Sequence, residues 1–171
     1  VSHAQGLYEL QSLVLITGDN SVSISGQLGD WPELKDTNLV FSLDGPDLSA
    51  WSPILKMDDL PVSAFSLDGG ISTTVAGFDL DAVSVVLGDS RFVINGTMGE
   101  PPEFTGTELN IEAAGPSLAD FQFLPGLPEV PDLPFQANGN IGLQDSGLVF
   151  EDLKLMFGDN SLQLSGLLGL N

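Results

Sequence analysis

Apolar and polar residues alternate along short stretches of this chain. Between residues 21 and 27 (SVSISGQ), Val22 and Ile24 alternate with three serines. Successive side chains of a β-strand point to opposite faces, so this stretch places apolar groups on one face and polar groups on the other. Such alternation is typical of an antiparallel sheet with one wet face. We therefore predict an all-β fold.

The same pattern predicts an order of elements for the first part of the chain. The predicted elements are a strand near 13–17, a turn at 18–20, strands at 21–27 and near 37–44, one helical turn at 46–51, and strands near 62–68 and 71–75. Pro46 and Pro116 suit the first turn of a short helix. The stretch GLPEVPDLP at 126–134 is too rich in proline for a strand or a helix and predicts a loop.

A hairpin-like segment occurs three times at a fixed offset. TGDNSVSISGQLG (17–29), LGDSRFVINGTMG (87–99) and FGDNSLQLSGLLG (157–169) follow one another at 70 residues, and GPDLS (45–49) and GPSLA (115–119) share the offset. Known solenoid units are typically about 20–50 residues long, so each unit here must hold several strands. We predict a lead-in at 1–12, β-repeats at 13–82 and 83–152, and the start of a third at 153–171. We also expect the chain to be a fragment of a longer one.

Corresponding strands of the units carry their apolar residues at matching positions. Only short segments such as PDLSAW are available as helices, so the apolar face needs another cover: a second sheet, the sheet curling on itself, or something that is not protein. A closed core is the default for a chain of this size, whereas an uncovered face would form an open groove in a curved sheet of 70-residue repeats. The residues predicted to line that groove are Leu13, Leu15, Val22, Ile24, Leu39, Phe41, Phe65, Val83, Val85, Phe92, Ile94, Leu109, Ile111, Phe135, Leu153 and Leu155.

The net charge of the chain excludes some classes of binding partner. The 171 residues include 24 Asp plus Glu against 4 Lys plus Arg, for a net charge of −20. Such a surface repels phosphate backbones and offers no basic patch for anionic headgroups, so nucleic-acid binding is not expected. The chain has no cysteine, which excludes disulfides and thiolate metal sites. The sequence also shows no apolar run near 18 residues and no signal peptide at its start.

Little in the sequence predicts catalysis, a cofactor or a metal. The single histidine, His3, offers no well-placed base, and no phosphate-binding loop, nucleophile elbow or zinc-protease motif is present. Acid pairs such as Asp58–Asp59, Asp79/Asp81 and Glu151–Asp152 are expected by chance in so acidic a chain. We predict that the protein is not an enzyme.

Two interpretations are possible for some residues that recur or match a known motif. The acids that recur in register, Asp19, Asp89 and Asp159, fit either tight turns or one weak calcium site per unit, and we favour the turns. Asn95-Gly96-Thr97 matches a glycosylation sequon but lies at a repeated hairpin position. We predict packing roles for Trp31 and Trp51.

The order and spacing of these motifs resemble the C-terminal region of AsmA-family proteins, over nearly the whole chain from about Leu10. The matching features are the GD[NS]-x5-G hairpin, a P-x-F-x-G-x-x-L-x-I strand from Pro102, the GPxL segment, and LPF-x-x-x-G-x-I from Leu133. The resemblance implies a long curved sheet with an apolar inner face, along which phospholipids move toward the outer membrane. It also implies no active site or cofactor. The expected location is the periplasmic face of the bacterial inner membrane, with the anchor outside this chain, the protein spanning toward the outer membrane, and possible envelope protein partners.

The residues themselves lead to a similar hypothesis. A sheet that is apolar on one face and lacks covering helices makes a trough, and acyl chains gain about 0.8 kcal/mol per CH2 group removed from water. We therefore expect a lipid-binding and lipid-transfer module. The alternatives are a structural or scaffolding β-repeat acting in outer-membrane assembly through protein contacts, and a calcium-stabilised adhesin-like repeat.

Overall fold

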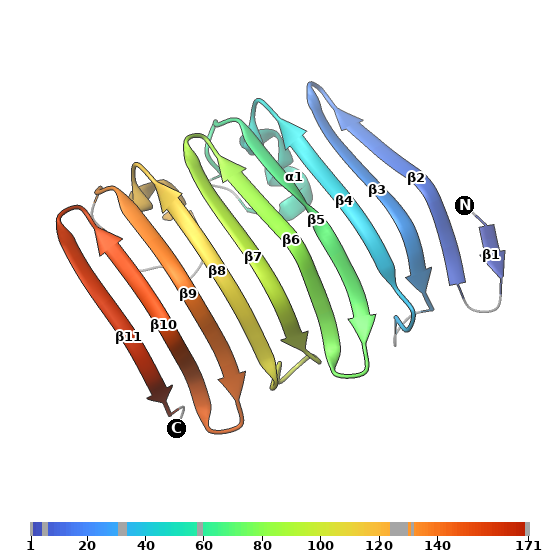
Figure 1. The fold of residues 1–171 in the computed structure, drawn as a ribbon. Helices are drawn as coiled ribbons and strands as arrows, with labels where there is room; N and C mark the ends of the chain where they lie inside the picture. The colour runs from blue at the N-terminus through green and yellow to red at the C-terminus, as the bar shows by residue number, and fades with distance from the viewer. Residues whose placement is uncertain are drawn as a thin grey trace.

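The computed structural model is one antiparallel sheet of eleven strands, in which every strand pairs with its neighbours in sequence (Figure 1). It describes residues 2–4, 7–30, 34–57, 60–123, 130 and 132–169, with the backbone alone at 2–4. The strands are β1 (Ser2–Ala4), β2 (Leu7–Thr17), β3 (Asn20–Gly29), β4 (Asn38–Gly45), β5 (Phe65–Thr74), β6 (Gly77–Leu87), β7 (Ser90–Gly99), β8 (Thr107–Gly115), β9 (Phe135–Gln144), β10 (Gly147–Phe157) and β11 (Asn160–Leu168). Three short helices, η1 (Leu48–Trp51), α1 (Ser52–Leu55) and η2 (Leu118–Phe121), complete the described elements. The predicted all-β fold, a curved and open antiparallel sheet with short helical turns, is confirmed.

The three acidic hairpins are each closed by a two-residue turn. Gly18, Gly88 and Gly158 have φ values of +61°, +55° and +55°, whereas the Asp that follows each of them keeps a negative φ. A glycine with positive φ at the first central position is the pattern of a type II′ turn, which suits the right-handed twist of a hairpin. The glycine, and not the Asp that follows it, therefore provides the backbone conformation that the turn requires.

Three of the long strands, β2, β6 and β10, contain a β-bulge. The register shifts between Leu10 and Leu13 in β2, between Leu80 and Val83 in β6, and between Phe150 and Leu153 in β10. The three strands begin at residues 7, 77 and 147, so both the strands and their bulges recur every 70 residues. A bulge inserts an extra residue and increases the local twist, which bends a long strand.

Three predicted details were wrong. Residues 65–74 form one strand through Gly69 and Gly70, and the turn comes at 75–76 instead. The first long strand begins at Leu7 rather than near Leu13. Pro46 and Pro116 precede the capping residues Asp47 and Ser117 of the short helices, so they lie outside the first turn. Most of the predicted loop at 126–134 lies outside the described residues.

The two long connections, 46–64 and 116–134, carry the short helices. Their buried side chains include Trp51, Leu60 and Phe121. Phe121 forms a core cluster with Leu87 and Phe135, and its ring lies 4.7 Å from that of Phe92 in an edge-to-face contact. The sheet thus has a small hydrophobic core at one end, where Figure 1 shows the short helices behind the sheet.

The rest of the sheet remains a single layer. The accessible surface is 10,768 Å², whereas a globular protein of 18 kDa is expected to expose about 8,000 Å². This larger accessible surface is expected for a sheet that is not covered by a second layer. No helix in the described part of the chain has the length and apolar character needed to cross a membrane.

Candidate functional site

One face of the sheet, called here the apolar face, consists of apolar rows that cross the strands. Directly paired residues of neighbouring strands lie on the same face, so the strand register defines these rows. One row, called the Leu39 row, contains Leu10, Gly26, Leu39, Ile71, Leu80, Gly96, Leu109, Ile141, Phe150 and Gly166. A parallel row contains Leu15, Val22, Leu43, Leu67, Val85, Phe92, Ala113, Ala137, Leu155 and Leu162.

Between these two rows lies a third, called the Ile111 row. Its directly paired members are Leu13, Ile24, Phe41 and Gly69 on β2–β5, Val83, Ile94, Ile111 and Gly139 on β6–β9, and Leu153 and Leu164 on β10 and β11. Rows lie about 7 Å apart, and ten strands extend over about 43 Å. The three rows therefore form an apolar band that crosses the sheet from β2 to β11.

The register places all sixteen predicted groove residues on this one face. Fourteen of them lie in the three rows, and the other two, Phe65 and Phe135, lie in a fourth row next to the tight turns. Twelve of them form two groups that differ in burial. The other four share the row of Phe92: Leu15, Val22, Val85 and Leu155.

The first group lies at the covered end, beneath the long connections. Phe65, Phe92 and Phe135 pack in or against the cluster that Phe121 completes, together with Leu48 and Phe123 from the connections. Asp47 and Ser117 hold the short helices in place, because their side chains accept hydrogen bonds from the backbone N–H groups of Ser49 (2.9 Å) and Ala119 (3.1 Å). These three phenylalanines are thus part of a protein core rather than of an open groove.

The second group lies on the Leu39 and Ile111 rows. Leu39, Ile94, Leu109 and Ile111 are half-buried, and they are not among the residues that pack against the Phe121 cluster. Val83 and Leu153 of the Ile111 row are instead buried at the bulges of β6 and β10. Figure 1 shows no helix over this half of the sheet. The part of the apolar face formed by these two rows is called the open part below.

Glycines allow neighbouring strands to approach each other at the bulges. A Cβ added to Gly69 would lie 2.9 Å from the Cα of Val83, and one added to Gly139 would lie 2.5 Å from the Cα of Leu153. Real Cβ atoms do not approach so closely, so a larger residue would push the bulged strand away. Above Gly69 the space is already filled, because an added Cβ would also lie 2.9 Å from Cγ2 of Val83 and 3.3 Å from the ring of Phe41.

The opposite face carries hydrogen-bonded polar side chains. Ser21 donates to Asp44 (2.8 Å), Ser42 to Asp68 (2.7 Å) and Thr97 to Asp79 (2.8 Å), each between side chains of neighbouring strands. Such pairs stabilise the sheet and keep this face wet. Asp79 of the acid pair Asp79/Asp81 therefore has a structural partner.

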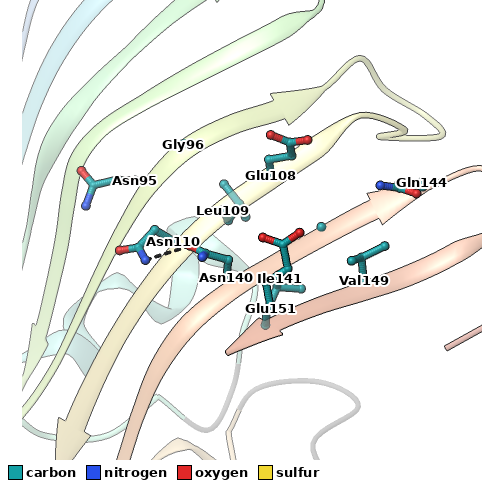
Figure 2. A pocket seen from close by; sticks show the side chains of 11 residues that line it. Asn95, Gly96, Glu108, Leu109, Asn110, Asn140, Ile141, Gln144, Val149 and Glu151 are labelled. Atoms are coloured by element: carbon teal, nitrogen blue, oxygen red, sulfur yellow. Dashed lines mark hydrogen bonds between the residues drawn. The ribbon is translucent and has the colours of Figure 1, made fainter. Parts of the chain in front are cut away.

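A row of amides on this polar face was not anticipated from the sequence. Asn95, Asn110 and Asn140 occupy paired positions on β7, β8 and β9, and the side-chain amide of Asn110 donates to that of Asn140 (2.9 Å). They line a shallow hollow of about 390 Å³, with Glu108, Gln144 and Glu151 around its rim (Figure 2). Only the strand register reveals the row, because its members are widely separated in sequence. Val149 also lines the hollow, so its lining is mixed rather than purely polar.

Asn95, the sequon residue, has a structural role in the β6 bulge. Its side-chain oxygen accepts a hydrogen bond from the backbone N–H of Ala82 (2.8 Å), a residue with a φ of +48°. This agrees with our explanation of the sequon by local geometry. Trp51 is buried as predicted, whereas Trp31 and the pair Asp58–Asp59 lie outside the described residues, as does the side chain of His3.

Asp19, Asp89 and Asp159 are exposed at the tips of their turns. The turns they belong to are separated by four strands, so they are about 19 Å apart. In the described ranges no three His, Asp or Glu side chains are grouped so that they could hold a metal ion.

Comparisons of the chain with protein-family models, with curated proteins and with solved structures give no match. The resemblance to the AsmA family therefore stays a prediction.

Proposed function

We propose that the chain is a lipid-binding and lipid-transfer module whose apolar face carries phospholipid acyl chains. The observation that carries this proposal is the open part of the apolar face, where two apolar rows cross ten strands beneath no described helix. Uncovered apolar surface of this extent is unusual for a soluble monomer and marks an interaction surface.

The geometry suits a ligand that is long, flexible and apolar. Each CH2 group removed from water contributes about 0.8 kcal/mol, and contact with one face removes roughly half of its surface. This attraction has no preferred direction, and the rows repeat from strand to strand with similar residues. An acyl chain can therefore move along the band without leaving a specific pocket.

The acidic, polar face opposite has a complementary role in this proposal. A net charge of −20 keeps a protein with so much apolar surface from aggregating. The headgroup of a bound lipid stays in water at the edge of the band. The protein then shields the acyl chains during passage through an aqueous compartment.

The cellular part of the proposal rests on the sequence resemblance alone. An AsmA-like module would act at the periplasmic face of the inner membrane, anchored through a segment outside this chain. It would carry phospholipid toward the outer membrane, with other envelope proteins as possible partners.

Native mass spectrometry and organic extraction of the purified protein test the proposal. We expect phospholipid to be recovered from the wild type, and much less from Ile111→Asp, which places a charge in the open part. Asn110→Asp is the matched control, because it adds the same group at the adjacent position on the polar face. If the wild type yields no phospholipid and Ile111→Asp leaves lipid transfer between vesicles unchanged, the proposal is wrong.

A structural or scaffolding role is the second candidate, favoured by the covered end. There the chain already buries its own apolar face under Phe121 and Leu48. If the apolar face serves protein contacts alone, the purified chain will contain no lipid and will not accelerate lipid exchange between vesicles.

A further inference from the structure

The apolar face reaches the end of the sheet that the long connections leave uncovered. Two residues beyond the Leu39 row, the strands carry another row of this face, whose members include Leu28, Thr73, Phe78, Met98, Thr107, Leu143 and Leu148. At the covered end, by contrast, Leu48 and Phe123 from the connections pack against the Phe121 cluster. A lipid whose acyl chains lie on the open part therefore meets protein at one end of the strands and water at the other. We place its headgroup at the uncovered end.

Four connections form the border of the apolar face at this uncovered end. They join β3 to β4, β5 to β6, β7 to β8 and β9 to β10, and their described residues, called the rim here, are 30, 34–37, 75–76, 100–106 and 145–146. The acids of the rim are Asp30, Asp36, Glu100, Glu103 and Asp145, and all five are exposed. The one base among these residues is Lys35. The rim therefore carries a net negative charge.

The other three bases of the chain lie away from the rim. Arg91 and Lys154 alternate with residues of the apolar face along β7 and β10, so both lie on the polar face. Lys56 follows α1 in the first long connection, at the covered end. A phosphate group at the uncovered end therefore faces mainly carboxylates.

We propose that the rim selects phospholipids whose headgroup carries an ammonium group and no net charge, and that it disfavours anionic phospholipids. This inference rests on the lipid-binding function proposed above and adds the class of lipid. In an ethanolamine headgroup the ammonium lies beyond the phosphate, so it is the group that can reach the exposed carboxylates of the rim. A glycerol headgroup leaves the charge of the phosphate uncompensated, and the same carboxylates repel it.

The size of this selection depends on the distance between the headgroup and the rim. The rim begins about 10 Å beyond the Leu39 row, because three residues of a strand span about that length. One carboxylate at about 10 Å changes the affinity for a unit charge roughly 2-fold in water. Salt weakens the interaction, since the Debye length falls from about 30 Å at 0.01 M to about 3 Å at 1 M. The selection should therefore be clear at low salt and absent at high salt.

Retention of lipid from mixed vesicles measures the selection. The vesicles contain phosphatidylethanolamine and phosphatidylglycerol in equal amounts and with the same acyl chains. After incubation the protein is separated from the vesicles, and its bound lipid is extracted and quantified by mass spectrometry. Both lipids leave the same vesicle surface, so repulsion between vesicle and protein affects them equally. We expect the wild type to retain about 3-fold more phosphatidylethanolamine than phosphatidylglycerol at 0.01 M salt, and about equal amounts at 1 M.

Two double variants with the same change in net charge test whether the rim is responsible. Glu103→Lys/Asp145→Lys reverses two acids on adjacent connections of the rim. Glu112→Lys/Glu151→Lys reverses two acids on the polar face. All four side chains are exposed, so the fold should tolerate both changes. At 0.01 M salt the rim variant should lower the ratio of the two lipids at least about 5-fold, and the polar-face variant less than about 2-fold.

The outcomes separate the selection from lipid binding itself. Equal retention of the two lipids by the wild type at every salt level would overturn the selection and leave lipid binding intact. Equal shifts in the two double variants would also overturn it, because the total charge rather than the rim would then determine the ratio. If the wild type retains neither lipid, the lipid-binding function is wrong, and the selection is wrong with it.

Discussion

The covered end and the open part of the apolar face are built from the same kinds of residue, yet they differ in what surrounds them. At the covered end, Phe92 and Phe135 contact Phe121, which belongs to a long connection. In the open part, Ile94 and Ile111 pair with each other across β7 and β8 and lie outside that cluster. The alternation along a strand determines which face a side chain occupies. Whether the side chain becomes core or ligand-binding surface depends on the connections.

Because of this difference, the covered end should contribute mainly to stability and the open part mainly to function. Burial of large aromatic side chains stabilises the fold, whereas half-exposed apolar groups contribute less to folding and remain available to a ligand. Substitutions at the covered end should therefore reduce stability first, and substitutions in the open part should reduce lipid binding first.

The largest effect is expected at the centre of the covered end. Phe121→Ala removes a buried ring that contacts Phe92 and Phe135 and should cost about 3 kcal/mol of unfolding free energy. Urea denaturation measures this loss. Phe104→Ala, in the loop after β7 and 37% exposed, is the control and should cost less than about 1 kcal/mol. Equal losses would mean that the covered end is not the core of the molecule.

Two adjacent glycines test the close strand approach beneath the open part. Gly69→Ala places a Cβ 2.9 Å from the Cα of Val83, whereas at Gly70 the nearest atom is an ordinary 3.5 Å away. Gly69→Ala should lower the unfolding free energy by about 2 kcal/mol, and Gly70→Ala should leave it unchanged or raise it slightly. Thermal or urea unfolding measures the stability of both variants. Equal changes in the unfolding free energy would contradict the bulge geometry.

The open part should respond in the opposite way to the covered end. Ile111→Asp should lower phospholipid affinity by at least 10-fold, about 1.4 kcal/mol, with a smaller loss of stability than Phe121→Ala. Vesicle-to-protein transfer of a fluorescent phospholipid measures the affinity. If Ile111→Asp unfolds the protein as severely as Phe121→Ala does, the two regions are one core and the comparison is wrong.

The smallest effect is expected at the tight turns. Asp89→Asn keeps the turn, because Gly88 and not Asp89 adopts the positive φ, and it should change the unfolding free energy by less than about 0.5 kcal/mol. Excess chelator should not shift the melting temperature of the wild type. A clear shift that Asp89→Asn reduces would instead support the calcium-stabilised alternative.

The sequence predicts which face of the sheet a strand residue occupies. It does not predict as well which other parts of the chain cover that face. Val22 and Ile24 alternate with serines, and this local signal is enough to assign their face. The Gly69–Gly70 pair was misread as a break, because glycine in a strand can mark a turn or a close approach, and only the bulge on β6 distinguishes the two. No local pattern separates Phe92, beneath Phe121, from Ile94, two residues further along β7. The connection that covers Phe92 is more than twenty residues away in sequence.

The most direct test of the account is photo-crosslinking from a single pair of positions. A photoreactive amino acid replaces Ile111 in one variant and Asn110 in the other, and each protein is incubated with phospholipid vesicles and irradiated. The two side chains are neighbours on β8 but point to opposite faces. We predict that position 111 crosslinks to acyl chains and position 110 does not. Equal crosslinking from both positions, or none from position 111, would contradict the assignment of the open part of the apolar face as the lipid site.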